Sequence, residues 1–243
     1  MPYWMTNEAL WGILLLANFL LILFAWKFWG KPGLWAWIVI AGITANLQVS
    51  KTIEILGLTA TLGNIVYAGS FLATDILSER FGKKAARTGV WIGFFSLLAF
   101  TLMMQLALFF EPAAGDVIQM HLNAIFGVLP RIVAASLIAY LVSQRHDIWA
   151  FHFWKNRFPG PLWLRNNFST IVSQLIDSVL FTVIAFWGVF PGGVLVEIVL
   201  TTYLFKAVVA IVDTPFLYLA LKIRSVAADE ADVVPEGTSG DAR

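Results

Sequence analysis

The sequence predicts an all-α membrane protein, a polytopic bundle of about seven transmembrane helices, because long apolar stretches recur along the chain. A bilayer core is about 30 Å thick, and about 20 apolar helical residues are needed to cross it. The composition agrees, since 59% of the 243 residues are hydrophobic and only 13% are charged. A soluble domain carries about 25% charged residues. Basic residues also gather in alternate connections, as expected for helices that cross a membrane back and forth.

The apolar stretches place the spans at 8–29, 33–50, 59–78, 87–110, 118–144, 168–189 and 194–222. The first stretch resembles a signal peptide, but its apolar part is longer than the usual ~7–15 residues. No Lys or Arg precedes it. We therefore expect the first stretch to be retained as a helix.

Two connections carry a clear excess of basic residues, one after the third span and one after the fifth. These residues are Arg80, Lys83, Lys84 and Arg87, and then Arg145, Lys155, Arg157 and Arg165. The connections at 111–117 and 190–193 carry none. The positive-inside rule then predicts an N-terminus outside and a C-terminus in the cytoplasm.

The chain is expected to form one transmembrane domain over residues 1–224, followed by an acidic tail over 225–243. The tail contains several Asp and Glu residues together with Pro and Gly, and it has little apolar content. Such a composition cannot bury enough apolar surface to fold, so we predict a disordered cytoplasmic segment.

Composition also excludes several classes of protein. Lys plus Arg total 16 and Asp plus Glu total 15, so the chain lacks the basic excess of a nucleic-acid-binding protein. It has no cysteine, which excludes disulfides and thiolate metal sites. The three histidines show no metal-binding spacing. We expect neither a metal nor another cofactor, and no nucleic acid as a partner.

Four ionisable residues interrupt the apolar stretches at membrane depth: Arg131, Asp177, Lys206 and Asp213. A charge in the middle of a bilayer costs at least about 2.5 kcal/mol, so such residues face a partner, the bundle interior or a polar cavity. They indicate a functional site. The alternative is structural, with Arg131 neutralising a buried carboxylate or Asp177 pairing with Lys206 or Arg131.

Proline lies beside a charge in two of these spans. Pro130 precedes Arg131, and Pro215 follows Asp213 closely. Proline inside a helix frees a carbonyl and usually bends the helix. Transporters build binding sites from such interrupted helices, because exposed backbone groups are tolerated there only where they line a cavity. We expect kinks at both prolines to allow alternating access.

Further polar groups lie at the same depth. Gln174 and Asp177 can approach one side of the sixth span. Asp177 and Asp213 are expected at a similar height on antiparallel helices, where two carboxylates could share a proton. Asn46 and Gln48 add amides in the second span, which bind either a ligand or a neighbouring helix.

The inner end of the third span carries a cluster of charges. Asp75 and Glu79 are one helical turn apart and lie beside Arg80. Ion pairs between these residues could close a gate at the cytoplasmic mouth. A solvated loop that only sets the topology would have the same pattern.

Four segments resemble, in the same order, the queuosine-precursor transporters, a branch of the vitamin uptake transporters. These are TDILSERFGKKAAR, PRIVAASLIAYLVSQ, WLRNNFSTIVSQLIDSVLF and YLFKAVVAIVDTPFLY. The resemblance covers residues 36–222. It implies a core of six helices over 33–222, with an additional helix over 1–32. It also implies import of a deazaguanine-type base, a precursor of the tRNA nucleoside queuosine, across the inner (plasma) membrane for salvage into tRNA modification.

The resemblance and the polar residues are chemically compatible. A guanine-type edge presents two adjacent N–H donors, and the carboxylate of Asp177 or Asp213 can accept both. Amides can serve the other polar atoms of the base, and the guanidinium of Arg131 can stack on its ring. The predicted substrate-binding residues are Asn46, Gln48, Arg131, Gln174, Asp177, Lys206 and Asp213. The expected partners are this small base and the lipid bilayer.

Two other functions stay open beside a secondary carrier. The chain could be the substrate-binding subunit of an ATP-driven importer, which needs a separate ATPase module because no Walker-type glycine loop is present here. It could also be an intramembrane aspartyl protease, with Asp177 and Asp213 as the dyad. The contexts LIDS and VDTP lack the expected Gly-x-Gly-Asp, so we expect a transporter and not an enzyme. Assembly of several identical chains also stays open.

Overall fold

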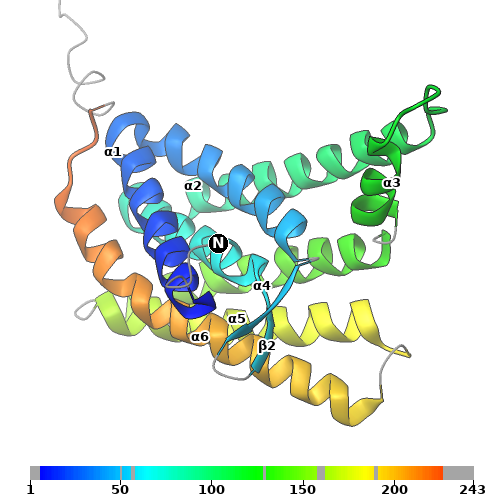
Figure 1. The fold of residues 1–243 in the computed structure, drawn as a ribbon. Helices are drawn as coiled ribbons and strands as arrows, with labels where there is room; N and C mark the ends of the chain where they lie inside the picture. Colours follow the sequence, from blue (N-terminus) through cyan, green and yellow to red (C-terminus); the bar gives the residue numbers. More distant parts are fainter. Residues whose placement is uncertain are drawn as a thin grey trace, which may run out of the picture.

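A computed structural model describes residues 6–49, 51–55, 58–127, 130–157, 162–188 and 191–226. The elements, in order, are α1 (Asn7–Gln48), β1 (Thr52–Ile55), β2 (Leu58–Thr61), α2 (Gly63–Leu108), α3 (Ile118–Leu122), the π-helical segment η1 (Asn123–Gly127), α4 (Pro130–Arg157), α5 (Leu162–Phe186) and α6 (Gly192–Lys222) (Figure 1). The predicted helical bundle is confirmed. Most of the predicted disordered tail, residues 227–243, lies outside the described residues.

Helices α1 and α2 are each longer than a bilayer is thick. They contain 42 and 46 residues. At about 1.5 Å per residue, each extends over about 60 Å or more. Both are interrupted by a glycine in the left-handed region, Gly30 with φ 58° and Gly82 with φ 78°. Glycine adopts this conformation because it has no Cβ. The two halves of α1 therefore run in different directions (Figure 1), and both interruptions fall in predicted connections between spans.

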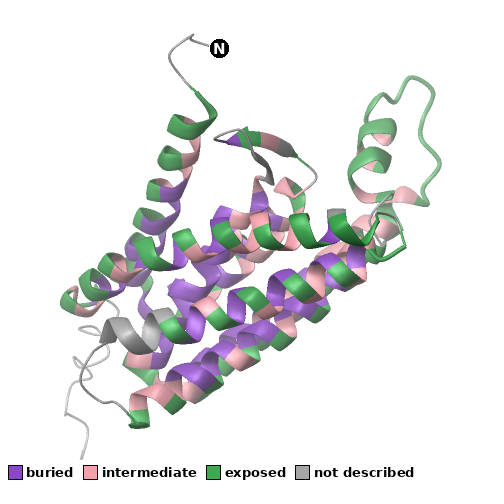
Figure 2. Cartoon of the chain, turned by 90° about the horizontal axis from the view of Figure 1, so that it is seen from below, coloured by how far each residue is buried: buried purple, intermediate pink, exposed green. Residues whose placement is uncertain are grey.

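Among the described residues, four helices are long and apolar enough to cross a membrane: α1, α2, α5 and α6. A fifth span results if the bent pair Ile118–Gly127 and Arg131–Arg157 is one crossing. The outer faces of these helices carry exposed large apolar side chains, including Leu20, Phe95 and Leu204. Figure 2 shows buried residues on the inner faces and exposed residues on the outer faces. Such an apolar exterior fits a surface in contact with lipid.

The predicted fifth span, 118–144, has the wrong boundaries. Residues 118–127 form the short α3 and η1, and α4 continues as far as Arg157. The two parts meet at an angle of 48° near Pro130. Apolar length misplaced this helix because its second half contains buried polar residues that lower the hydropathy. By contrast, α6 runs through Pro215 from Gly192 to Lys222 without a break.

The predicted third span, 59–78, starts too early. Residues 52–55 and 58–61 form an antiparallel hairpin, in which Thr52 pairs with Thr61 and Ile55 with Leu58. The segment is rich in Thr and Ile, whose β-branched side chains favour extended backbone. Helix α2 then begins at Gly63. The hairpin therefore joins the end of α1 to the start of α2.

Small residues set the distance between α2 and its neighbours. A Cβ on Gly69 would lie 2.4 Å from Nδ2 of Asn18 on α1, and a Cβ on Gly93 would lie 2.4 Å from Oη of Tyr140 on α4. The buried Asn18 amide donates to the carbonyl of Ile65 at 3.2 Å. Glycine at a helix interface permits close backbone approach, as in other membrane bundles. These contacts fix how α1 packs against the first half of α2 and how α4 packs against the second half.

Candidate functional site

The centre of the bundle is polar. Helices α2, α4, α5 and α6 each contribute buried hydroxyl, amide or charged side chains that are at most 3% exposed. These residues are Ser70, Thr74, Asp75, Ser78, Ser143, Gln144, Asp147, Ser169, Thr170, Ser173, Gln174, Asp177, Ser178, Thr182, Lys206 and Asp213. Buried polar groups are costly unless they are bonded. Their concentration between four helices therefore points to a functional interior.

A cavity lies at one end of this polar interior. It contains about 410 Å³ of space, part of which is open to the surroundings. The lining comes from the end of α1, the start of α2, and α4, α5 and α6. The lining residues are Ala45, Asn46, Val49, Gly63, Asn64, Tyr67, Ser136, Ala139, Asp177, Phe181 and Lys206.

An ion pair lies in the wall of the cavity. Lys206 Nζ is 2.5 Å from Asp177 Oδ2, and both side chains are 4% exposed. Tyr67 Oη donates to the other carboxylate oxygen at 2.6 Å, and Ser143 Oγ donates to it at 3.1 Å. The ammonium group of Lys206 also lies 5.0 Å from the centroid of the Tyr67 ring. Four helices thus meet at one carboxylate whose two oxygens are both bonded.

This pairing is chemically consistent with its burial. Hydrogen bonds to charged groups are about twice as strong as neutral ones. Such bonds, together with the opposite charge, offset the cost of removing Asp177 and Lys206 from water. These two are the charged residues among those that line the cavity. The cavity therefore offers a ligand one acceptor and one donor of opposite charge, already held together.

The structure brings three of the predicted site residues together: Asn46, Asp177 and Lys206. The Asn46 amide donates to the carbonyl of Gly42 at 2.9 Å within its own helix. The pairing of Asp177 with Lys206 was one of the alternatives predicted from the sequence. It places the two residues in the wall of a cavity as well as in an ion pair.

Arg131 lies outside the cavity and binds the end of a helix. Its Nε donates to the carbonyl of Ile184 at 2.7 Å, and its Nη2 donates to that of Trp187 at 2.6 Å. The last carbonyls of a helix have no partner within the helix, and a cation there also interacts favourably with the helix dipole. Arg131 therefore caps the end of α5, which is a structural contact but not the predicted neutralisation of a carboxylate.

Asp213, Gln48 and Gln174 also lie outside the cavity lining. Asp213 is 1% exposed and acts electrostatically on Asp75. Asp177 lines the cavity and Asp213 does not, and the predicted carboxylate dyad stays a prediction. Gln174 is fully buried, and neither amide atom has a hydrogen-bond partner among the described residues. Gln48 is half-buried.

The predicted inner-mouth residues connect the end of the first half of α2 to its neighbours. Lys155 Nζ on α4 lies 3.0 Å from Glu79 Oε2. Arg80 donates to the carbonyl of Leu221 near the end of α6. Asp75, one turn earlier, is buried. These contacts close the bundle at the end opposite the cavity, and a gating role for them stays a prediction.

Sequence reasoning missed two residues on α4, Ser143 and Asp147. The predicted span ends at residue 144, so Ser143 falls at its end and Asp147 falls in the connection that follows. Tyr140, Ser143 and Asp147 are spaced at i, i+3 and i+7, which places them on one face of a helix. This spacing was the signal that could have extended the helix. Within the described residues, no group of three or more His, Asp or Glu residues could hold a metal ion.

Comparison with known proteins decides the family. Residues 61–220 match a family described as "putative vitamin uptake transporter". A "probable queuosine precursor transporter" of Bacillus subtilis (strain 168) is 45% identical over 221 residues, which are 90% of this chain and 96% of that protein. The chain belongs to the queuosine precursor transporter family. The family predicted from the four sequence segments is thereby confirmed.

A second relative supports the same family. The "queuosine precursor transporter" of Escherichia coli (strain K12) is 28% identical over 172 residues, 70% of this chain and 76% of that protein. No solved structure matches the chain. Together with its apolar helices, membership of this transporter family makes the chain a multi-pass protein of the cell membrane, as the sequence predicts.

Proposed function

We propose that this chain imports a queuosine precursor, a deazaguanine-type base, as a secondary carrier that binds the base in the cavity beside Asp177 and Lys206. Its relatives are named as transporters of such a precursor. The observation that carries the proposal is the Asp177–Lys206 ion pair in the cavity wall, in which Nζ and Oδ2 are 2.5 Å apart. A carrier needs polar groups that bond to each other when the site is empty and to the ligand when it is bound. Asp177 and Lys206 can do both.

The chemistry of the base complements this pair. A guanine-type edge carries one carbonyl acceptor followed by two N–H donors. The carboxylate of Asp177 can accept the two donors together, while the ammonium of Lys206 donates to the carbonyl. Binding then replaces the direct ion pair with a bridged one, so that neither charge is left alone. This exchange keeps the cost of desolvating both groups low.

Aromatic side chains in the cavity fit a flat ligand. Tyr67 and Phe181 both contribute to the lining. Stacking of a base on an aromatic ring is worth about 1–3 kcal/mol. The amides of Asn46 and Asn64 lie in the same cavity and can serve the remaining polar atoms of the base.

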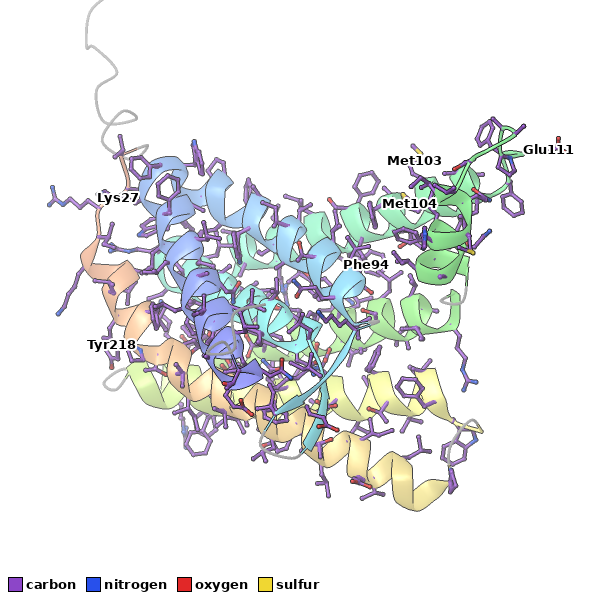
Figure 3. The ribbon with its side chains drawn as sticks, in the orientation of Figure 1. Lys27, Phe94, Met103, Met104, Glu111 and Tyr218 are labelled. Carbon is purple, nitrogen blue, oxygen red and sulfur yellow. The ribbon has the colours of Figure 1, made fainter. Side chains whose placement is uncertain are left out.

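The chain is proposed to cross the membrane seven times. The interruptions at Gly30 and Gly82 allow α1 and α2 to cross twice each, and α4, α5 and α6 add three crossings. Lys27 and Tyr218 lie at the left of the molecule, and Glu111 lies at the far right (Figure 3). By the positive-inside rule, the end that carries Lys27 and Tyr218 lies in the cytoplasm and the N-terminus lies outside. The six-helix core then begins at residue 33, and the part of α1 before it is the added helix.

In this orientation the cavity opens to the outside, because it is lined by the end of α1 and the start of α2. The contacts of Glu79 with Lys155 and of Arg80 with Leu221 lie at the cytoplasmic end. The structure is then an outward-facing state. Import requires these inner contacts to open after the base has bound, as alternating access demands.

Uptake by the purified chain in liposomes tests this function. We expect the chain alone to take up tritium-labelled deazaguanine. We expect Asp177→Asn to abolish uptake, because an amide is uncharged and has one acceptor oxygen, whereas a carboxylate accepts two N–H donors with its two oxygens. Asp116→Asn is the matched control, because this carboxylate is exposed and its Oδ1 accepts from the backbone of Ile118, which an amide oxygen can also do. Retained uptake in Asp177→Asn would remove this residue from the site.

A binding measurement separates the alternatives. Ligands that bind only the folded state raise its thermal stability. Stabilisation by deazaguanine without uptake would favour a substrate-binding subunit that needs a separate ATPase module. The protease alternative is weakened because Asp177 is bonded to Lys206 in the cavity wall, whereas Asp213 lies outside the cavity lining. Absence of both binding and uptake would refute the proposed function.

A further inference from the structure

A second group of buried carboxyls lies apart from the cavity. Asp75 on α2 is 1% exposed and Asp147 on α4 is 0% exposed. Their side chains are within hydrogen-bonding reach of each other. Thr170 Oγ1 on α5 also donates to Asp75 Oδ2 at 3.4 Å. Neither carboxylate lines the cavity, so the binding of a base in the cavity leaves this pair without a role.

Further charged groups lie around this pair. On α6, Asp213 acts on Asp75 and adds a further carboxylate. One turn after Asp75, Glu79 is engaged with Lys155 of α4. Within the side chains that the structure describes, no ion pair joins a Lys or Arg to Asp75 or Asp147. On α4, His146 is half-buried and bonds to Ser173 Oγ at 2.9 Å.

Two adjacent carboxyls in such a place need a proton. A carboxylate only accepts hydrogen bonds, so a bond between Asp75 and Asp147 exists only when one of them carries a hydrogen. Two like charges side by side in a low-dielectric interior cannot both persist, as in the carboxyl dyads of aspartic proteases. The pair is therefore suited to hold one proton and to release it when its surroundings become wet.

A buried amide lies between this pair and the cavity. Gln174 is on α5, one turn from Thr170 and one turn from Asp177. It projects from the buried face of α5, and neither of its amide atoms has a partner among the described residues. A fully buried amide without a partner costs about 1–3 kcal/mol, which calls for an occupant such as water or a moving proton carrier.

Two separate sets of hydrogen bonds lie between the two sites on the other side of the interior. Gln144 Nε2 on α4 donates to Ser70 Oγ at 2.9 Å, and Thr74 Oγ1 donates to Gln144 Oε1 at 3.3 Å. Ser143, the residue before Gln144, donates to Asp177 in the cavity wall. Polar side chains thus extend from the cavity to the residue before Asp75. Protons move along such chains of hydroxyls and waters in other transporters.

We propose that Asp75 and Asp147 form a proton-binding site, and that the proton held there accompanies the base and couples its import to the proton gradient. This proposal rests on the proposed function. The proton enters from outside through the cavity, binds one carboxyl oxygen of the pair, and leaves to the cytoplasm when the inner contacts open. No bond other than this O–H bond forms or breaks. With a neutral base, each cycle moves one positive charge inward.

Proton-driven uptake tests the coupling. With the membrane potential held at zero and an inward gradient of one pH unit, a carrier that moves one proton per base accumulates the base up to about tenfold. We expect Asp75→Asn and Asp147→Asn to lose this accumulation and to reach only equal concentrations. Both should still equilibrate labelled deazaguanine, because Asn resembles the neutral carboxyl. Asp116→Asn should accumulate like the unaltered chain.

Infrared spectroscopy tests the proton itself, without transport. The unaltered protein should show the carbonyl band of a protonated carboxyl at neutral pH, and this band should be lost or shifted in Asp147→Asn. Absence of the band in the unaltered protein would overturn the proposal, as would tenfold accumulation by either Asn variant. If neither variant folds, the proposal is tested by whether the unaltered protein shows this band. Failure of the unaltered chain to bind or equilibrate deazaguanine would instead refute the proposed function.

Discussion

Breaking the Asp177–Lys206 pair should destabilise the protein in a predictable way. Lys206→Met removes the cation and leaves a carboxylate whose side chain is 4% exposed. Loss of one partner of a buried ion pair costs about 3–5 kcal/mol, because the other charge stays buried and uncompensated. Tyr67 and Ser143 still donate to one oxygen of this carboxylate. These bonds place the expected loss near the lower limit, about 3 kcal/mol.

Thermal unfolding of the purified protein measures this loss. For a protein of this size, about 1 kcal/mol corresponds to a change in Tm of about 2–4 °C, so Lys206→Met should lower the Tm by about 6–12 °C. Lys222→Met is the matched control, because Lys222 lies on the same helix and is exposed. Its loss should cost less than about 1 kcal/mol, the usual worth of a cation at a helix end.

A double-mutant cycle then tests whether the two charges stabilise each other. Asp177→Asn removes the negative charge and keeps an oxygen that can accept from Tyr67 and Ser143. Combined with Lys206→Met, it leaves no buried charge in the pair. We expect the double variant to recover about 2 kcal/mol relative to the sum of the single variants, within the usual range for residues in contact. A double variant as unstable as that sum would refute the reasoning.

Three further substitutions test other contacts. Tyr67→Phe removes a hydrogen bond of 2.6 Å to a carboxylate and should lower the unfolding free energy by about 1.5–3 kcal/mol; an unchanged Tm would contradict this role. Arg131→Gln should lower the Tm but preserve uptake in liposomes, since it removes a cap; lost uptake at unchanged stability would return the residue to the binding site. Gly93→Val should lower the unfolding free energy by about 1–3 kcal/mol, because the added Cβ would meet Tyr140. The control Gly12→Ala, where the added Cβ meets open space, should be as stable as the unaltered protein.

Much of the fold could be predicted from the sequence because lipid restricts which helices are possible. Each crossing needs an apolar stretch of sufficient length, and charged residues between crossings are read directly from the chain. The stretches in α1 and α2 and the connections at Gly30 and Gly82 were found in this way. The prediction failed where polarity concealed a helix, as in the second half of α4, and where β-branched residues formed the strands β1 and β2.

The candidate site was only partly predictable. The buried charges of α5 and α6 stand out in an apolar sequence, and Asp177 and Lys206 were identified for that reason. Their partners were left open between several residues, since spacing along one helix does not show which neighbouring helix a side chain meets. Ser143 and Asp147 escaped notice because they are ordinary polar residues near a predicted span end. Only their burial between α2 and α5 makes them exceptional.

The sequence by itself determined that this chain is a membrane-embedded helical protein, because the lipid bilayer imposes a length and an apolar composition on every span. Four segments of the sequence also indicated the transporter family. The tertiary structure alone decided that Asp177 binds Lys206 and that Arg131 caps a helix. Those outcomes depend on the rotation and crossing angle of each helix, which arise from packing of the whole bundle and not from any single segment.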